Sequence, residues 1–302
     1  MAASTVPRKP VMPALSPQTQ RAVRIILIVA ALIGYAIGLG ALRLHLTMDP
    51  LVDVHAYYDA GARLNAGEPL YIQAATTDDP AFYRYPPLLA IVFRPLALLP
   101  FETAAAIWLT ILLCATALTI VRLLRDRPPL AVFIACGILA MPILWTLAIG
   151  QAQAIVTFLL STTTPVGVAL AGHLKLTPWL VGIYWIARRD RRALGHLVAW
   201  VVGMGALQLV LAPADTVAFL SFSTFAQVGD VRNLSPWDVS PVLWVVTVVT
   251  LAAVAWRLAP TRWGWAAAVV LSVGATPRLL AYQLSTLLAA LAKPAPRDEN
   301  RT

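Results

Sequence analysis

Charged side chains are scarce in this sequence. Only 12% of its 302 residues are Asp, Glu, Lys or Arg, and 59% are hydrophobic. An average soluble domain carries about 25% charged residues. A chain this apolar does not have enough polar surface to cover itself in water, which excludes an ordinary soluble domain. The composition therefore indicates a protein whose main solvent is the lipid bilayer.

The sequence also lacks the motifs of metal, thiol and nucleotide chemistry. Its two cysteines, Cys114 and Cys136, lie inside long apolar runs, where each is expected to be a small packing residue without a disulfide. The four histidines are scattered along the chain, and no His/Cys cluster has metal-ligand spacing. There is no Walker A loop and no GxGxxG turn after a strand. We therefore expect neither a metal nor a cofactor.

Long apolar segments predict an all-α fold, a polytopic bundle of transmembrane helices. A helical span needs about 20 residues. The segments lie at residues 23–42, 103–123, 130–148, 194–212, 240–258, 262–275 and 277–292. Residues 151–187 are also apolar but are broken by Pro165, Lys175 and Pro178. Three crossings in so short a stretch would have to include half-helices or re-entrant pieces shielded by protein.

The ends of the chain are more polar than its middle. Residues 1–22 are expected to be a disordered cytoplasmic tail, and residues 293–302 a second one. Between them, residues 23–292 form the predicted membrane domain. Arg21 and Arg24 lie at the start of its first apolar run, which favours a retained signal-anchor over a cleaved signal peptide.

The arginines decide the predicted orientation. Residues 85–100 are apolar but contain an arginine and four prolines. If this stretch lies along the surface, Arg122, Arg125 and Arg127 fall on the same side as the arginines of 188–192, which satisfies the positive-inside rule. About ten spans with both termini cytoplasmic result. Inside lie 16 basic and four acidic residues (+12), and outside seven basic and ten acidic (−3). The net charge of +9 is thus a topology signal, and no nucleic-acid partner is expected.

Two predicted outer segments, residues 43–102 and 213–239, are large enough to build a site. The first contains seven of the 14 acidic residues, whereas the predicted spans contain no Asp or Glu. Coupled transporters usually keep an acidic residue near the midplane. Asp53, expected at the membrane–water boundary beside aromatic residues, suits a general base acting on a sugar hydroxyl. The alternative is that acidic residues just outside a first span only solvate the loop.

Several short motifs then follow in a fixed order. They are Asp53-x-x-x-Tyr57 with Gly67-x-x-Leu70-Tyr71, Tyr85-Pro86-Pro87 with Pro95-Leu96-Ala97-Leu98-Leu99-Pro100, Gly150-Gln151 with Lys175-Leu176-Thr177-Pro178, Asn233-Leu234-Ser235, and Thr276-Pro277-Arg278 with Tyr282. In this order they resemble glycosyltransferase family 87, which comprises integral-membrane, GT-C type mannosyltransferases, over residues 45–290. The resemblance implies a GT-C-like bundle whose first outer loop carries juxtamembrane helices, including residues 85–100.

The resemblance implies an inverting transfer of a hexose, usually mannose, on the extracytoplasmic face of the cell membrane. The donor would be a polyprenyl-phosphate-linked sugar and the acceptor a lipid or glycan, with membrane lipids around the protein. Asp53 matches the family's first-loop aspartate and would deprotonate the acceptor hydroxyl. Asp49, four residues earlier and before a proline, is the alternative base, and His55 could orient a group in the site.

Further residues acquire roles from the same resemblance. Lys175 and Arg278 would bind the donor phosphate, because a leaving phosphate needs positive charge nearby. Gln151 and Asn233 would hydrogen-bond the sugar or the acceptor. Three tyrosines would line the sugar pocket, namely Tyr57, Tyr71 and Tyr85. Each has a structural alternative: a snorkelling lysine, an interface arginine, a helix cap for Gln151, a turn for Asn233 and an aromatic belt for the tyrosines.

Two other functions remain open at this stage. One is a transporter or flippase for a lipid or small solute, against which the outer location of the polar residues argues. The other is a catalytically reduced relative that acts as an assembly partner. Two departures from the family motivate this second alternative. The stretch from Gly150 to Lys175 is shorter than is expected of the family, and Tyr282-Gln283 stands where relatives often have an acidic residue or a histidine.

Overall fold

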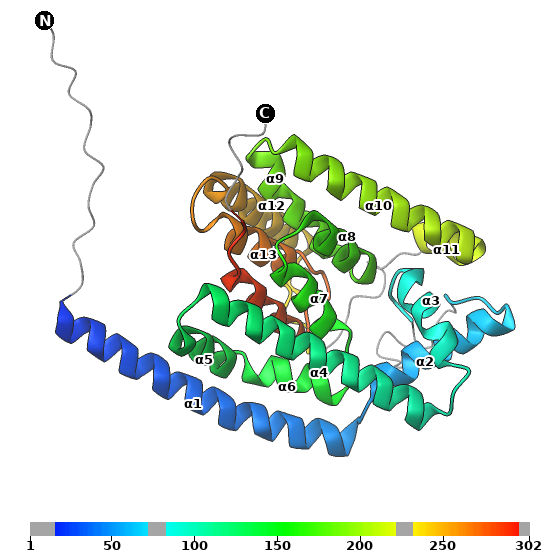
Figure 1. The fold of residues 1–302 in the computed structure, drawn as a ribbon, viewed down its shortest axis with the longest axis horizontal. Helices are drawn as coiled ribbons and strands as arrows, with labels where there is room; N and C mark the ends of the chain where they lie inside the picture. The colour runs from blue at the N-terminus through cyan, green and yellow to red at the C-terminus, as the bar shows by residue number, and fades with distance from the viewer. Residues whose placement is uncertain (1–15, 72–82, 222–231, 296–302) are drawn as a thin grey trace, which may run out of the picture.

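The computed structural model describes residues 16–71, 83–221 and 232–295 (Figure 1). Within these ranges every regular element is a helix, which confirms the predicted all-α class. The elements are α1 (Pro17–Met48), α2 (Val52–Ala66), α3 (Pro87–Leu96), α4 (Phe101–Asp126), α5 (Pro129–Ile138), α6 (Ala140–Ala148), α7 (Gln153–Ser161), α8 (Pro165–Leu174), η1 (Thr177–Gly182), α9 (Ile183–Ala187), α10 (Arg191–Leu211), α11 (Pro213–Ser221), η3 (Pro236–Asp238), α12 (Pro241–Leu258), α13 (Gly264–Gly274) and η4 (Ala281–Leu291).

Four described helices, α1, α4, α10 and α12, are long and apolar enough to cross a membrane. The bent pair α5–α6, with an angle of 65° between its halves, adds a fifth if it is one span. In the most apolar 18-residue stretch of each helix, only 6% of α12 and 33% of α4 is buried inside the protein. Such large uncovered apolar surfaces belong in lipid, so the chain is a helical membrane protein. The prediction of about ten spans depends on the shorter helices and stays a prediction.

The proline-broken region contains half-length helices, as its sequence indicates. α7 has nine residues and α8 has ten, with a turn at residues 162–164 between them. At 1.5 Å per residue, each is about 15 Å long, half of the roughly 30 Å hydrocarbon core. Pro165 begins α8, and the Thr164 side chain caps it by accepting a hydrogen bond from the Gly167 backbone N–H.

The apolar stretch 85–100 also contains only a short helix. α3 covers ten residues, about 15 Å, and packs on α2. Arg94 and Asn65 join the two helices: Arg94 Nε donates to Asn65 Oδ1 at 3.0 Å, and Asn65 Nδ2 donates to the Arg94 carbonyl oxygen at 2.9 Å. This helix is too short to span, which agrees with the predicted surface placement.

The two polar segments predicted to lie outside the bilayer meet at one end of the bundle. Figure 1 shows α2, α3 and α11 gathered at the end of the molecule opposite the N-terminal end of α1. Asp215, near the start of α11, accepts a hydrogen bond from the Leu70 backbone N–H at 2.8 Å. Residues 145 positions apart therefore build one surface.

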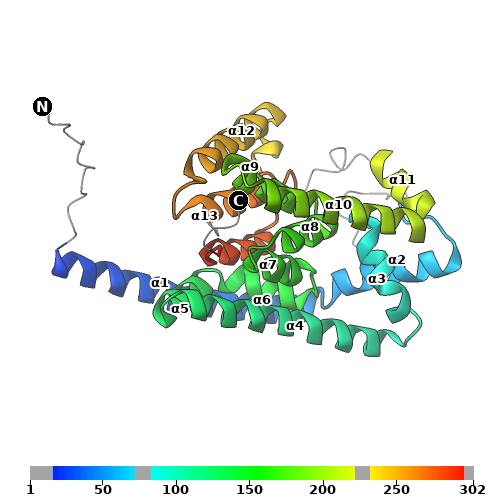
Figure 2. The same cartoon turned by 45° about the horizontal axis from the view of Figure 1, so that its top comes forward.

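Arginines act as caps elsewhere in the bundle. Arg127 Nε donates to the carbonyl oxygen of Leu291 at 2.7 Å, and Arg188 donates to that of Ala259 at 3.1 Å. These carbonyls lie at or just after the C-terminal ends of η4 and α12, where helices leave backbone oxygens unsatisfied and where the helix dipole favours cations. Arginines that the topology assigned to one side of the membrane thus also terminate helices. Figure 2 shows α1, α4, α5 and α6 below α12 and α13.

Candidate active site

The start of α2 fixes the position of Asp53. Leu51, immediately before this helix, adopts a left-handed conformation with φ 56°. The backbone N–H groups of Leu51 and Asp53 donate to the carbonyl oxygens of Ala148 and Ile149, each at 3.1 Å. These are carbonyls at the C-terminal end of α6, which that helix cannot satisfy itself. The end of α6 therefore holds the backbone that carries the Asp53 carboxylate.

Gln151 orients that carboxylate. It follows Gly150, whose positive φ of 72° turns the chain out of α6, and its side chain is fully buried. Gln151 Nε2 donates to Asp53 Oδ2 at 3.0 Å and to the Tyr85 hydroxyl at 2.9 Å, while its Oε1 accepts from the Tyr57 hydroxyl at 2.6 Å. Both amide protons of Gln151 are therefore used. Asp53 Oδ1 makes no hydrogen bond within the described residues, so it has room to receive a proton.

Charge and burial act on Asp53 in opposite directions. Burial raises the pKa of the Asp53 carboxyl to about 6, although Lys175, Arg278 and Arg84 lower it and Asp49 raises it slightly further. Burial also raises the pKa of Tyr85 to about 12, so its hydroxyl stays protonated. A carboxylate that changes protonation near pH 6 is well matched to removing a proton at neutral pH.

Lys175 is the buried cation of the site. It lies at the C-terminal end of α8, and its Nζ has no hydrogen-bond partner among the described residues. The ammonium instead lies 5.3 Å from the centre of the Tyr85 ring and 5.0 Å from that of Tyr282, within the range of cation–π attraction. All three of its N–H donors are thus available to an anion.

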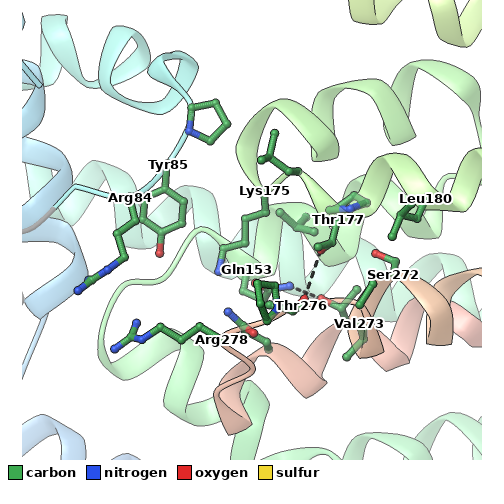
Figure 3. A pocket seen from close by; sticks show the side chains of 18 of the residues that line it. Arg84, Tyr85, Gln153, Lys175, Thr177, Leu180, Ser272, Val273, Thr276 and Arg278 are labelled. Atoms are coloured by element: carbon green, nitrogen blue, oxygen red, sulfur yellow. Dashed lines mark hydrogen bonds between the residues drawn. The ribbon is translucent and has the colours of Figure 1, made fainter. Parts of the chain in front are cut away.

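A cavity of about 470 Å³ adjoins these residues. Its polar lining includes Arg84, Tyr85, Gln153, Lys175, Arg278 and Tyr282, and its apolar lining includes Leu176, Leu180, Phe219, Trp244, Val248 and Val273. Figure 3 shows the cationic side chains on one side, with Leu180 and Val273 on the other. Asp53 does not line the cavity; Gln151 connects it to Tyr85, which does. The site thus combines a buried carboxylate, cationic side chains and an apolar chamber.

Most of the predicted site residues come together here. Asp53, Tyr57, Tyr85 and Gln151 form one hydrogen-bonded cluster. Lys175 contacts this cluster through the Tyr85 ring, and Arg278 lines the adjoining cavity. Five segments far apart in sequence supply them.

Two predicted residues lie beside the cluster. The Tyr71 hydroxyl donates to the Tyr85 carbonyl oxygen at 2.8 Å, so it supports the backbone of a site residue. The Asn233 side chain donates to the Pro277 carbonyl oxygen at 3.1 Å and accepts from the Leu279 N–H at 2.8 Å. Asn233 therefore holds the residues on both sides of Arg278. Their predicted contacts with a sugar stay predictions.

The alternative base is engaged elsewhere. Asp49 Oδ1 lies 2.8 Å from His45 Nδ1, and the His45 ring stacks on Trp145 with 4.4 Å between ring centres. His55 stacks on Phe101, with 3.8 Å between centres. No hydrogen bond joins either residue to Gln151 within the described residues. The role of Asp53 as the base stays a prediction.

Sequence reasoning missed four lining residues: Arg84, Gln153, Tyr282 as a cation–π partner, and Gln283. A signal was present, because Gln153 and Gln283 are amides in otherwise apolar segments and Gln153 follows Gln151 by two positions. In the described part of the chain, no group of three or more His, Cys, Asp or Glu residues could hold a metal ion. Cys114 and Cys136 are both free thiols.

Comparison with known proteins gives a family and two relatives. A family model described as glycosyltransferase family 87 matches residues 82–294. A curated protein of Mycolicibacterium smegmatis, named polyprenol-phosphate-mannose-dependent alpha-(1-2)-phosphatidylinositol pentamannoside mannosyltransferase, is 34% identical over 156 residues, covering 46% of this chain and 38% of the relative. A Mycobacterium tuberculosis protein of the same name is 28% identical over 205 residues, covering 61% of this chain and 46% of the relative.

These matches leave part of each protein uncompared. The chain spans less than half the length of the curated relatives it matches. Asp53 precedes the region that the family model matches. No solved structure matches the chain.

Proposed function

Because the chain belongs to glycosyltransferase family 87, we propose that it is a membrane mannosyltransferase. It moves a mannosyl group from a polyprenyl-phosphate donor to a lipid or glycan acceptor. Both curated relatives are named as enzymes that depend on polyprenol-phosphate-mannose. The glycolipid class of the acceptor is taken from the same names.

One observation carries the proposal: Asp53, held by Gln151, stands beside three cations at the edge of a cavity. Asp53 Oδ1 takes the proton of the acceptor hydroxyl as its oxygen attacks the anomeric carbon of the donor. The new carbon–oxygen bond forms while the bond to the phosphate oxygen breaks. A single displacement of this kind inverts the configuration of the anomeric carbon.

The leaving group is a polyprenyl phosphate, and the cavity suits both of its parts. Lys175 offers unsatisfied N–H donors, and Arg278 and Arg84 line the same space. Positive groups placed in advance where charge develops stabilise the transition state in a site of low dielectric constant. The apolar wall of Leu176, Leu180 and Val248 suits the first isoprene units of the lipid.

The same proposal includes the topology. The reaction takes place on the extracytoplasmic face, in a GT-C-like bundle of about ten spans with both termini cytoplasmic. It is supported by the positive-inside distribution of the arginines. It is further supported by the gathering of the acidic segment 43–102 with α11 at one end of the bundle (Figure 1).

The test measures the transfer of a hexose to an acceptor directly. Purified full-length chain in lipid nanodiscs is incubated with polyprenyl-phosphate mannose and a membrane glycolipid extract, and products are followed by mass spectrometry. The proposal expects an acceptor heavier by one hexose, together with release of polyprenyl phosphate. An Asp53→Asn preparation, inserted in the same way, is the matched control.

Two results would contradict the proposal. Radiolabelled lipid or solute that crosses liposome membranes without any transfer product would favour the transporter. Binding of the donor without turnover under any acceptor condition would favour a catalytically reduced relative.

A further inference from the structure

Two amide oxygens at the cavity have no hydrogen-bond donor. Gln153 Oε1 and Gln283 Oε1 are buried, and neither has a partner among the described residues. Both side chains line the cavity that Lys175 also lines, and Gln153 is only 4% exposed. A buried acceptor left without a donor costs free energy. These oxygens therefore point to a ligand that brings donors.

Hydrogen counting fixes the orientation of the Gln153 amide. The Thr157 hydroxyl donates its only proton to the Gln153 backbone carbonyl oxygen at 2.8 Å. The Thr286 hydroxyl, 3.3 Å away, must then be the donor to Thr157 Oγ1. Thr286 Oγ1 is left as an acceptor, and its close contact with the Gln153 side chain is a bond from Nε2. The Gln153 oxygen is thereby directed away from this chain of hydroxyls.

Gln283 lies on the same wall. It precedes Thr286 by three residues in η4, a 3₁₀ helix, and side chains three residues apart line up in such a helix. Thr286 in turn contacts Gln153. Figure 3 shows Gln153 and Lys175 reaching into the same part of the cavity from different helices. Two acceptors and one cationic donor thus share a single chamber.

The chemistry of these atoms separates the two parts of a sugar phosphate. A phosphate diester offers only acceptors, so it is bound by Lys175 and not by amide oxygens. Sugar hydroxyls are donors as well as acceptors and match the two glutamine oxygens. We propose that Gln153 and Gln283 form the hexose subsite of the cavity and accept hydrogen bonds from hydroxyls of the donor sugar. This inference rests on the proposed function.

Donor and acceptor sugars both carry hydroxyls, and the donor is favoured by position. The hexose of the donor is bonded directly to the phosphate, and the glutamines share the cavity with Lys175. Asp53, the base that faces the acceptor, does not line this cavity.

The test compares two lipids in the absence of any acceptor. Binding of polyprenyl-phosphate mannose and of polyprenyl phosphate to the full-length chain in nanodiscs is measured calorimetrically for wild type, Gln153→Leu and Gln283→Leu. Leucine keeps the approximate volume and removes the oxygen. Each variant should bind the mannosyl lipid about 2- to 12-fold more weakly, the range for one neutral hydrogen bond. Its affinity for the bare phosphate should be that of wild type.

Ser285→Ala is the matched control, because Ser285 follows Gln283 by two residues but lines a separate, smaller cavity. It should change neither affinity. Equal loss for both lipids, or no loss for either, would overturn the subsite. So would a defect confined to the KM for the acceptor. If Gln153→Leu does not yield folded protein, Gln283→Leu decides the matter by itself.

Failure of the proposed function would look different. In that case wild type gives no hexose-transfer product in the transfer assay, whereas failure of the subsite alone leaves that transfer intact.

Discussion

Gln151 Nε2 donates a hydrogen bond to Asp53 Oδ2 across 3.0 Å, between residues 98 positions apart in the chain. The same amide group holds the hydroxyls of Tyr57 and Tyr85. One carboxylate oxygen is therefore fixed by a fully buried side chain, while the other stays available. That arrangement aims a base in a defined direction, and the predictions below depend on it.

Asp53→Asn should reduce transfer by about 10² to 10⁴-fold, the usual contribution of a positioned general base. Asparagine keeps an oxygen that can accept the bond from Gln151 but cannot take up the proton. Initial rates of hexose transfer measure the effect, and yield in the membrane fraction verifies insertion. Asp59→Asn, on the exposed side of the same helix, should behave as wild type. Full activity in Asp53→Asn would remove Asp53 from the mechanism.

Activity should fall in acid, because the base works only when it is deprotonated. With the pKa of the Asp53 carboxyl at about 6, kcat/KM should fall about tenfold for each pH unit well below 6. A pH–rate profile of kcat/KM for the acceptor, measured with acceptor well below its KM, gives this limb.

Two substitutions should move the acid limb in opposite directions. Arg84→Gln removes a charge that lowers the pKa of Asp53, so the limb should move to higher pH. Asp49→Asn removes a charge that raises the same pKa, so the limb should move to lower pH. An unchanged limb in both variants would show that another group titrates.

Lys175→Met should weaken use of the donor. A hydrogen bond to a charged group contributes about 1.5 to 3 kcal/mol, so kcat/KM should fall roughly 10- to 150-fold. Lys175→Arg should recover part of the loss. Lys293→Met removes an exposed lysine near the C-terminus and serves as control. Donor titrations at fixed acceptor give the numbers, and equal effects at both lysines would contradict a phosphate role.

Gly150→Ala should destabilise the fold at the site. A Cβ at this position would lie 2.1 Å from Val54 Cγ2, and the φ of 72° is one that L side chains rarely adopt. Forcing extra atoms into packed surroundings costs about 1 to 3 kcal/mol. Thermal unfolding in detergent should show a lower midpoint for Gly150→Ala.

A double variant tests whether the clash with Val54 causes the loss of stability in Gly150→Ala. In the double variant Val54→Ala with Gly150→Ala, the clashing methyl group is absent. The double variant should therefore lose less stability than the sum of the losses in the two single variants. Simple additivity would mean that the contact is not the source. Gly40→Ala, where a Cβ meets nothing within 4 Å, should not lower the midpoint.

Much of the fold could be predicted from apolar runs. The segment 103–123 lies within α4, and 240–258 nearly coincides with α12. In lipid a run of this length is stable as a helix, because a helix forms hydrogen bonds between its own backbone N–H and C=O groups. The half-length helices of 151–187 were signalled by Pro165 and Pro178. The bend between α5 and α6 also had a signal, which treating residues 130–148 as one apolar run overlooked. Pro142 has no N–H to donate to the carbonyl oxygen of Ile138, the last residue of α5.

The candidate site was predicted less evenly. Asp53 was selected because it is expected at the membrane–water boundary beside aromatic residues, and Gln151 and Lys175 were selected from the resemblance to the family. Asn233 was selected on the same ground, yet it bonds to backbone on both sides of Arg278. A side-chain amide serves a turn and a ligand equally well, and only its neighbours in space tell the two apart.

The sequence by itself determined that this chain belongs in a membrane and which of its segments are long apolar helices. These properties follow from composition and local periodicity, which depend on neighbours along the chain. Only the tertiary structure decided that Gln151 holds Asp53, that Lys175 lies between two tyrosine rings, and that Gln153 and Gln283 present unsatisfied oxygens to one cavity. Those contacts join residues 90 or more positions apart, and hydrogen bonds and cavities depend on distances that helix packing alone sets.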